Sequence, residues 1–110
     1  MRMIHAIIVD DEQHCLDRLT YLLTTYASKT VQVVGTFMTL EEGNKAIETL
    51  HPDLVFLDIQ IGEHTGFDLL SSFRKIDFEV IFTTAYEKYA VKAFKYSAID
   101  YLLKPIERDE

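Results

Sequence analysis

The sequence predicts an α/β fold, a doubly wound five-stranded parallel sheet with helices on both faces. Two observations support this prediction. Short β-rich runs alternate with segments in which apolar residues recur at helical spacing. Several of the β-rich runs are almost continuously apolar, which is typical of strands that are covered on both faces. A parallel sheet joined by right-handed crossovers fits both patterns.

The elements follow one another in a regular order. Five strands are expected, at residues 4–9 (IHAIIV), 31–37 (VQVVGTF), 53–58 (DLVFLD), 79–84 (EVIFTT) and 100–104 (DYLLK). Helical patterns follow the first four strands, with apolar positions Leu16, Leu19, Leu23 and Tyr26; Leu40, Ile47 and Leu50; Phe67, Leu70 and Phe73; and Ala90, Ala93 and Phe94. The sequence stops at IERDE, where a fifth helix should begin. We therefore expect the last helix to be truncated or missing and the sequence to be one piece of a longer protein.

The composition restricts the possible functions. The 110 residues suit one domain with a single core. The net charge of −7 makes this segment a poor binder of nucleic acid. No apolar run approaches the roughly 20 residues of a membrane-spanning helix, so no membrane contact is expected. The single cysteine, Cys15, excludes an internal disulfide and favours a reducing, cytoplasmic location.

Polar residues stand at the carboxyl ends of four predicted strands. Asp10 and Asp11 follow the first strand, Asp58 ends the third, Thr84 ends the fourth and Lys104 ends the fifth. Ligands of open α/β sheets bind beyond these ends. Clustered carboxylates repel one another unless a cation lies among them, and an all-oxygen cluster suits Mg²⁺. A hydroxyl and an ammonium nearby could bind phosphoryl oxygens, so the set suggests phosphoryl transfer.

Four segments in this order, IIVDDE, LVFLDI, IFTTAY and YLLKPI, resemble the receiver domain of bacterial two-component response regulators. The segment TTAYEKYAVKAFKYSAIDYLLKPI is most similar to the receivers of the LytTR (LytR/AlgR) family. The resemblance spans residues 1–110 and implies the flavodoxin-like strand order 2-1-3-4-5. It also implies a LytTR-type output domain outside this chain, through which DNA would be bound and transcription regulated.

The resemblance assigns roles to the strand-end residues. Asp58 would be the phosphoacceptor, a carboxylate that takes a phosphoryl group from the phosphohistidine of a sensor histidine kinase. Asp11, Asp58 and the backbone carbonyl of Gln60 would ligate Mg²⁺ directly, and Asp10 would act through a water molecule. Thr84 and Lys104 would hold the phosphoryl oxygens. The chain would be no classical enzyme, since it would catalyse only its own phosphorylation and dephosphorylation.

The resemblance also implies a conformational switch. On phosphorylation, Thr84 would move toward the phosphoryl group and Tyr101 would turn inward. The face of the fourth strand, fourth helix and fifth strand would then change, with a homodimer as the expected result. The Lys104–Pro105 bond matches a bond that is cis in the family. One departure is Ile61-Gly62, where the family usually has Met-Pro; this change would leave the loop more mobile.

Simpler structural roles remain open for the individual residues. Asp10 and Asp11 could cap the following helix, Asp58 could open a turn, and Tyr101 could be a half-buried packing residue. The four histidines (His5, His14, His51 and His64) lack ligand spacing, so we predict structural or surface roles for them. Cys15 is predicted to pack on the first helix. Gly66 is predicted to open the third helix for steric reasons.

Three other protein classes are alternatives. A haloacid-dehalogenase-like phosphatase needs its nucleophile on the first strand and a second Asp two positions later, where this chain has Glu12. A flavodoxin needs a hydroxyl-rich phosphate loop after the first strand, which DDEQHC is not. A receiver-like dimerisation module that is never phosphorylated remains possible, although the complete set of Asp58, Thr84 and Lys104 argues against it.

Overall fold

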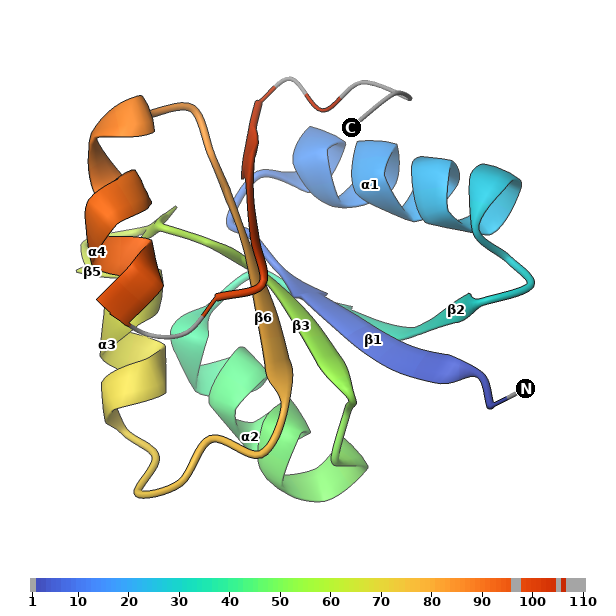
Figure 1. The fold of residues 1–110 in the computed structure, drawn as a ribbon, viewed down its shortest axis with the longest axis horizontal. Coiled ribbons are helices and arrows are strands. Elements are labelled where there is room, and N and C mark those ends of the chain that lie inside the picture. The colour runs from blue at the N-terminus through green and yellow to red at the C-terminus, as the bar shows by residue number, and fades with distance from the viewer. Residues whose placement is uncertain (1, 96–97, 105, 107–110) are drawn as a thin grey trace.

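The computed structural model describes residues 2–95, 98–104 and 106. Five strands form one parallel sheet in the order β2-β1-β3-β6-β7, which confirms the predicted fold class and strand order (Figure 1). These strands are β1 (Ile4–Val9), β2 (Val31–Phe37), β3 (Leu54–Asp58), β6 (Glu79–Thr84) and β7 (Asp100–Leu103). The helices are α1 (Gln13–Tyr26), α2 (Leu40–Leu50), α3 (Gly66–Ser71), the short 3₁₀ helix η1 (Glu87–Tyr89) and α4 (Ala90–Lys95).

The sheet is covered on both faces. Helix α1 lies over one face, and α2, α3 and α4 lie over the other (Figure 1). Each face of the sheet has its own apolar core. Successive residues of β1 alternate between them: Ala6 and Ile8 pack in the core under α1, whereas Ile7 and Val9 pack in the core on the opposite face. All five residues of β3 are buried. Burial on both sides explains why these strands are apolar without alternation.

Helix α3 begins where the chain leaves the end of β3. A capping box fixes its first turn: the Thr65 hydroxyl accepts a hydrogen bond from the Asp68 amide, and the Asp68 carboxylate accepts one from the Thr65 amide. The Gly66 amide donates to the Ile59 carbonyl at 2.7 Å. A Cβ atom at Gly66 would lie only 2.4 Å from the Asp58 carbonyl oxygen. The steric role predicted for Gly66 is therefore confirmed.

The structure differs from the sequence-based expectations in several details. A small antiparallel hairpin, β4 (Gln60–Ile61) with β5 (His64–Thr65), precedes α3 and was not predicted. Its strands are too short to produce a recognisable period. On α1 the third buried leucine is Leu22, whereas Tyr26 is 52% exposed. Leu23, also in the last turn, is partly buried against the same core, so only the end of the helix at Tyr26 extends past it.

The chain after β7 is where the fifth helix is expected to be truncated or missing. In the part of the chain that the structure describes, no helix follows β7. Ile106 is buried in the core between α1 and the sheet, and its carbonyl accepts a hydrogen bond from Arg18 of α1. None of the described helices has the length and apolar character needed to span a membrane.

Candidate functional site

The register of the sheet brings distant carboxylates together. Strands β1 and β3 pair as far as Val9 and Leu57, so the next residues, Asp10 and Asp58, end neighbouring strands. Both carboxylates are buried, with Asp10 2% and Asp58 5% exposed. Buried carboxylates need compensating charges or hydrogen bonds. Their position at one edge of the sheet therefore points to a functional site.

Lys104 supplies the compensating charge. The Lys104 amide donates to the Thr84 carbonyl at 2.8 Å, which aligns the end of β7 with the end of β6. The Lys104 Nζ atom lies 2.7 Å from an oxygen of Asp10, 3.1 Å from an oxygen of Asp58 and 3.4 Å from an oxygen of Glu12. One ammonium group thus contacts three carboxylates. The structure brings Asp10, Asp58 and Lys104 together as the sequence predicted, and it adds Glu12, which the sequence analysis did not include.

The environment shifts the proton affinities of Asp58 and Lys104. Burial raises the pKa of Asp58, and the charge of Asp10 raises it further; Lys104 and the Gln60 amide oppose this only in part, so the pKa is about 6. Burial disfavours the Lys104 ammonium, but its hydrogen bond to Asp10 and the charges of Asp58 and Asp10 outweigh burial and raise the pKa of Lys104. Lys104 is therefore positively charged at neutral pH, whereas Asp58 lacks a full set of counter-charges.

The carboxylates have the chemistry of a hard-cation site. Oxygen atoms of Asp10, Asp11, Glu12 and Asp58 lie within 4.8 Å of one another. Carboxylate oxygens are the ligands that Mg²⁺ prefers, so the donor set fits this ion. An ion among these oxygens would offset the repulsion between Asp10 and Asp58 that raises the pKa of Asp58.

Backbone amides of the loop after β3 donate hydrogen bonds to two of the predicted site residues, Asp58 and Asp11. The Gln60 amide donates to an Asp58 carboxylate oxygen at 3.3 Å. The Gly62 amide donates to an Asp11 oxygen at 2.9 Å. Gly62 has a φ of 59°, and a proline at this position would have neither that φ nor an N–H. The departure from Met-Pro therefore provides Asp11 with a backbone donor. The role of the Gln60 carbonyl as a ligand stays a prediction.

The predicted switch residues are connected through Tyr86. Thr84 is 1% exposed, and its hydroxyl accepts a hydrogen bond from the Tyr86 amide at 3.3 Å. Tyr101 is half-buried, and its hydroxyl donates to the Tyr86 carbonyl. The same peptide segment thus contacts both residues, although their roles in a switch stay predictions. Pro105 lies outside the described residues, so the structure does not test the predicted cis bond.

Comparisons with known proteins agree with this geometry. The family model described as "Response regulator receiver domain" matches residues 6–110. A response regulatory protein of Vibrio cholerae is 42% identical over 97% of this chain and 45% of its own length. The sensory transduction protein LytT of Bacillus cereus is 36% identical over 97% of this chain and 44% of its own length. This chain therefore spans less than half the length of these relatives.

Among solved structures, the response regulatory domain of protein mrkE from Klebsiella pneumoniae superposes with a TM-score of 0.84. The two chains are 30% identical, and the superposition covers 96% of this chain and 87% of the other. The similarity thus extends to the whole sheet and its helices.

Proposed function

Because this chain belongs to the response regulator receiver family, which works in phosphorelay signalling, we propose that it accepts a phosphoryl group on Asp58 in a Mg²⁺-dependent reaction. The observation that carries the proposal is the position of the Asp58 carboxylate, buried at the sheet edge and 3.1 Å from the Lys104 ammonium. An Asp58 oxygen would attack the phosphorus of a phosphohistidine. A P–O bond to Asp58 would form as the P–N bond of the donor breaks.

The neighbouring residues would bind Mg²⁺ and the oxygens of the transferred phosphoryl group. Asp10, Asp11, Asp58 and the Gln60 carbonyl would hold Mg²⁺, which when bound neutralises charge on the transferred phosphoryl group. Lys104 already lies beside Asp58 and would contact a second phosphoryl oxygen. The Thr84 hydroxyl would leave the Tyr86 amide and donate to a third oxygen.

The change at Thr84 would reach the surface through Tyr86. Because Tyr86 contacts both Thr84 and Tyr101, loss of one hydrogen bond would alter the packing of the other residue. The face formed by β6, α4 and β7 would respond, and we propose that it controls formation of a homodimer.

The proposed partners follow from the family and its relatives. The phosphoryl donor would be a sensor histidine kinase, which places the reaction in the cytoplasm, where ATP is available. The similarity to LytT supports a LytTR-type output domain in the full protein, which would bind DNA and regulate transcription. This chain itself would contribute no nucleic-acid contact, since its net charge is −7.

The phosphorylation site can be tested by intact-mass measurement after incubation with acetyl phosphate and Mg²⁺. We expect the wild-type chain to gain one phosphoryl group and Asp58→Asn to remain at background, because an amide is a poor nucleophile. Chelation of Mg²⁺ with EDTA should abolish labelling of the wild type, because the clustered carboxylates then repel the incoming phosphoryl group.

The matched control is Asp77→Asn, which changes an exposed aspartate outside the site. It should be labelled as the wild type is. Equal labelling of Asp58→Asn would contradict the proposal. Steady release of phosphate without a requirement for Asp58 would favour the phosphatase alternative, and absence of any labelling would favour the unphosphorylated module.

A further inference from the structure

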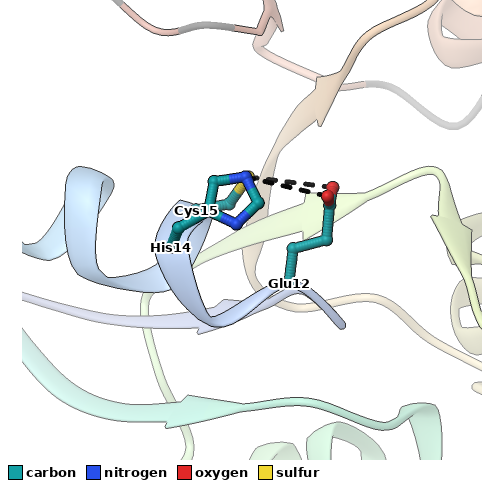
Figure 2. Close-up of side chains that lie close together, drawn as sticks. All are labelled: Glu12, His14 and Cys15. Carbon is teal, nitrogen blue, oxygen red and sulfur yellow. Dashed lines mark hydrogen bonds and ion pairs between the residues drawn. The ribbon is translucent and has the colours of Figure 1, made fainter.

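Three side chains of different chemistry converge at the start of α1. Figure 2 shows His14 and Cys15 directed toward the carboxylate of Glu12. The His14 Nε2 atom is 3.7 Å from one Glu12 oxygen, and the Cys15 Sγ atom is 3.8 Å from the other. One ligand atom from each residue lies within 4.8 Å of the other two. An imidazole nitrogen, a thiol sulfur and a carboxylate oxygen therefore surround one small volume.

The contacts with Glu12 are one long ion pair, from His14, and one weak thiol hydrogen bond, from Cys15. A good N–H···O hydrogen bond measures about 2.7–3.2 Å, so the 3.7 Å between His14 and Glu12 is too long for one. Zinc bonds of about 2.0–2.3 Å arranged as a tetrahedron place neighbouring ligand atoms about 3.3–3.7 Å apart. The contacts of 3.7 Å from His14 and 3.8 Å from Cys15 are made with different Glu12 oxygens, and they lie at and just above the upper limit of this range. Binding of an ion through one Glu12 oxygen would therefore draw the three side chains together, from separations of up to 4.8 Å.

We propose that Glu12, His14 and Cys15 bind Zn²⁺ or a chemically similar transition-metal ion. Imidazole and thiolate are ligands that Zn²⁺ prefers and Mg²⁺ does not, so this site differs in selectivity from the all-oxygen cluster. The three residues also border a cavity of about 370 Å³, which leaves room for water as a fourth ligand. The proposal does not depend on phosphorylation of Asp58.

Binding through sulfur requires Cys15 to lose its proton. Burial raises the pKa of Cys15, so the free protein carries the thiol form at neutral pH. On binding, the sulfur–proton bond is replaced by a sulfur–metal bond and the proton passes to solvent.

The proposed site shares Glu12 with the site described above. The Glu12 oxygen that faces Cys15 is also 3.4 Å from Lys104 Nζ. An ion at Glu12 competes with Lys104 for this carboxylate. When the ion is bound, Lys104 keeps Asp10 and Asp58 as its partners. Binding at the start of α1 therefore changes the charge balance around Asp58.

Cobalt absorption spectroscopy tests the site, because only a thiolate ligand gives Co²⁺ a sulfur-to-metal charge-transfer band in the near ultraviolet. The titration is done with Mg²⁺ in excess, so that the all-oxygen cluster is not a competitor. We expect one Co²⁺ per chain to produce the band and Zn²⁺ to remove it by displacement. Cys15→Ser should abolish the band, and His14→Asn should weaken binding about tenfold or more.

Two controls make the result specific. His51→Asn changes a histidine outside the cluster, at a left-handed position (φ 47°) that Asn also tolerates, and it should bind Co²⁺ as the wild type does. Asp58→Asn should keep the band, which separates this site from the proposed phosphorylation. Absence of the band in the wild type, its persistence in Cys15→Ser, or unchanged affinity in His14→Asn would each overturn the proposal.

A separate NMR experiment tests the proposed competition between the metal ion and Lys104 for Glu12. Addition of Zn²⁺ to the Mg²⁺-loaded protein should shift the side-chain NMR resonances of Lys104 in the wild type, because Glu12 is withdrawn from its ammonium group. Cys15→Ser should show no such shift. Resonances of Lys104 that stay unchanged while Zn²⁺ binds would overturn the proposed competition for Glu12.

Discussion

At the scale of single residues, the site is governed by a shortage of positive charge. Lys104 is shared among Asp10, Glu12 and Asp58, so Asp58 has only part of one ammonium group as its partner. Asp58 is also buried, which disfavours its charged form. The same shortage that would attract a divalent cation makes the ionised Asp58 unfavourable in its absence.

This shortage predicts how Asp58→Asn changes stability with pH. The pKa of Asp58 is raised from 3.8 to about 6 on folding, so its protonated form favours the folded state below pH 4 and this contribution is lost as the pH rises through 6. The asparagine side chain of the variant has no proton to lose. In Mg²⁺-free buffer, the stability of Asp58→Asn relative to wild type should therefore increase by up to about 3 kcal/mol between pH 4 and pH 8.

Urea denaturation of both proteins across this range measures the effect. Carboxylates remote from Asp58 are common to the two proteins and cancel in the difference, which therefore reports Asp58 together with the neighbours to which it is coupled. A difference that stays constant with pH would show that Asp58 titrates as an ordinary aspartate.

At the scale of the elements, the start of α3 positions the end of β3. The Gly66 amide donates to the Ile59 carbonyl, and the backbone of Gly66 lies against the Asp58 carbonyl. The helix can approach this closely only because Gly66 has no side chain. The orientation of Asp58 thus depends on how α3 packs as well as on its own strand.

We predict that Gly66→Ala lowers the free energy of unfolding by about 2–3 kcal/mol, because its Cβ would lie 2.4 Å from the Asp58 carbonyl oxygen. Asp58 would have to move, so labelling by acetyl phosphate should also slow. Chemical denaturation and the intact-mass assay measure the two effects.

Gly62→Ala is the matched control. A Cβ atom at Gly62 meets nothing within 4 Å, so only its positive φ opposes the change, at a cost of about 1 kcal/mol. Equal stability of the two variants would show that the close approach of Gly66 to Asp58 is not important.

At the scale of the whole molecule, a proposed signal must pass from a buried carboxylate to an outer face. Tyr86 would provide the route, because its amide donates to Thr84 and its carbonyl accepts from Tyr101. Tyr86 itself is 46% exposed, so a change in its hydrogen bonds reaches the surface directly. Such a route works only if the two hydrogen bonds are coupled.

Thr84→Val tests this coupling, since it removes the hydroxyl and keeps the shape of the side chain. With beryllofluoride and Mg²⁺, we expect amide NMR shifts at Tyr86 and along β7 in the wild type, and shifts confined to the neighbourhood of Asp58 in Thr84→Val. Sedimentation of the same samples reports dimer formation. If the shifts at Tyr86 and β7 are equally large in Thr84→Val, the hydroxyl does not transmit the change.

The sequence by itself determined the architecture and most of the site. The five strand runs and the residues at their ends are local features, because periodicity is read within a few neighbouring residues. A parallel sheet then brings the strand ends to one edge, which places Asp10, Asp58 and Lys104 together. The specific role proposed for Asp58 rests on the resemblance to the receiver family and was not evident from spacing alone.

Only the tertiary structure decided which side chains share partners. The contact of Glu12 with Lys104 joins residues from opposite ends of the chain, and the register of β1, β3, β6 and β7 sets its length. His14 and Cys15 have no common metal-ligand spacing in the sequence, and their convergence on Glu12 depends on side-chain direction in the first turn of α1. Distances of a few ångströms between side chains follow from packing, and a linear pattern does not contain them.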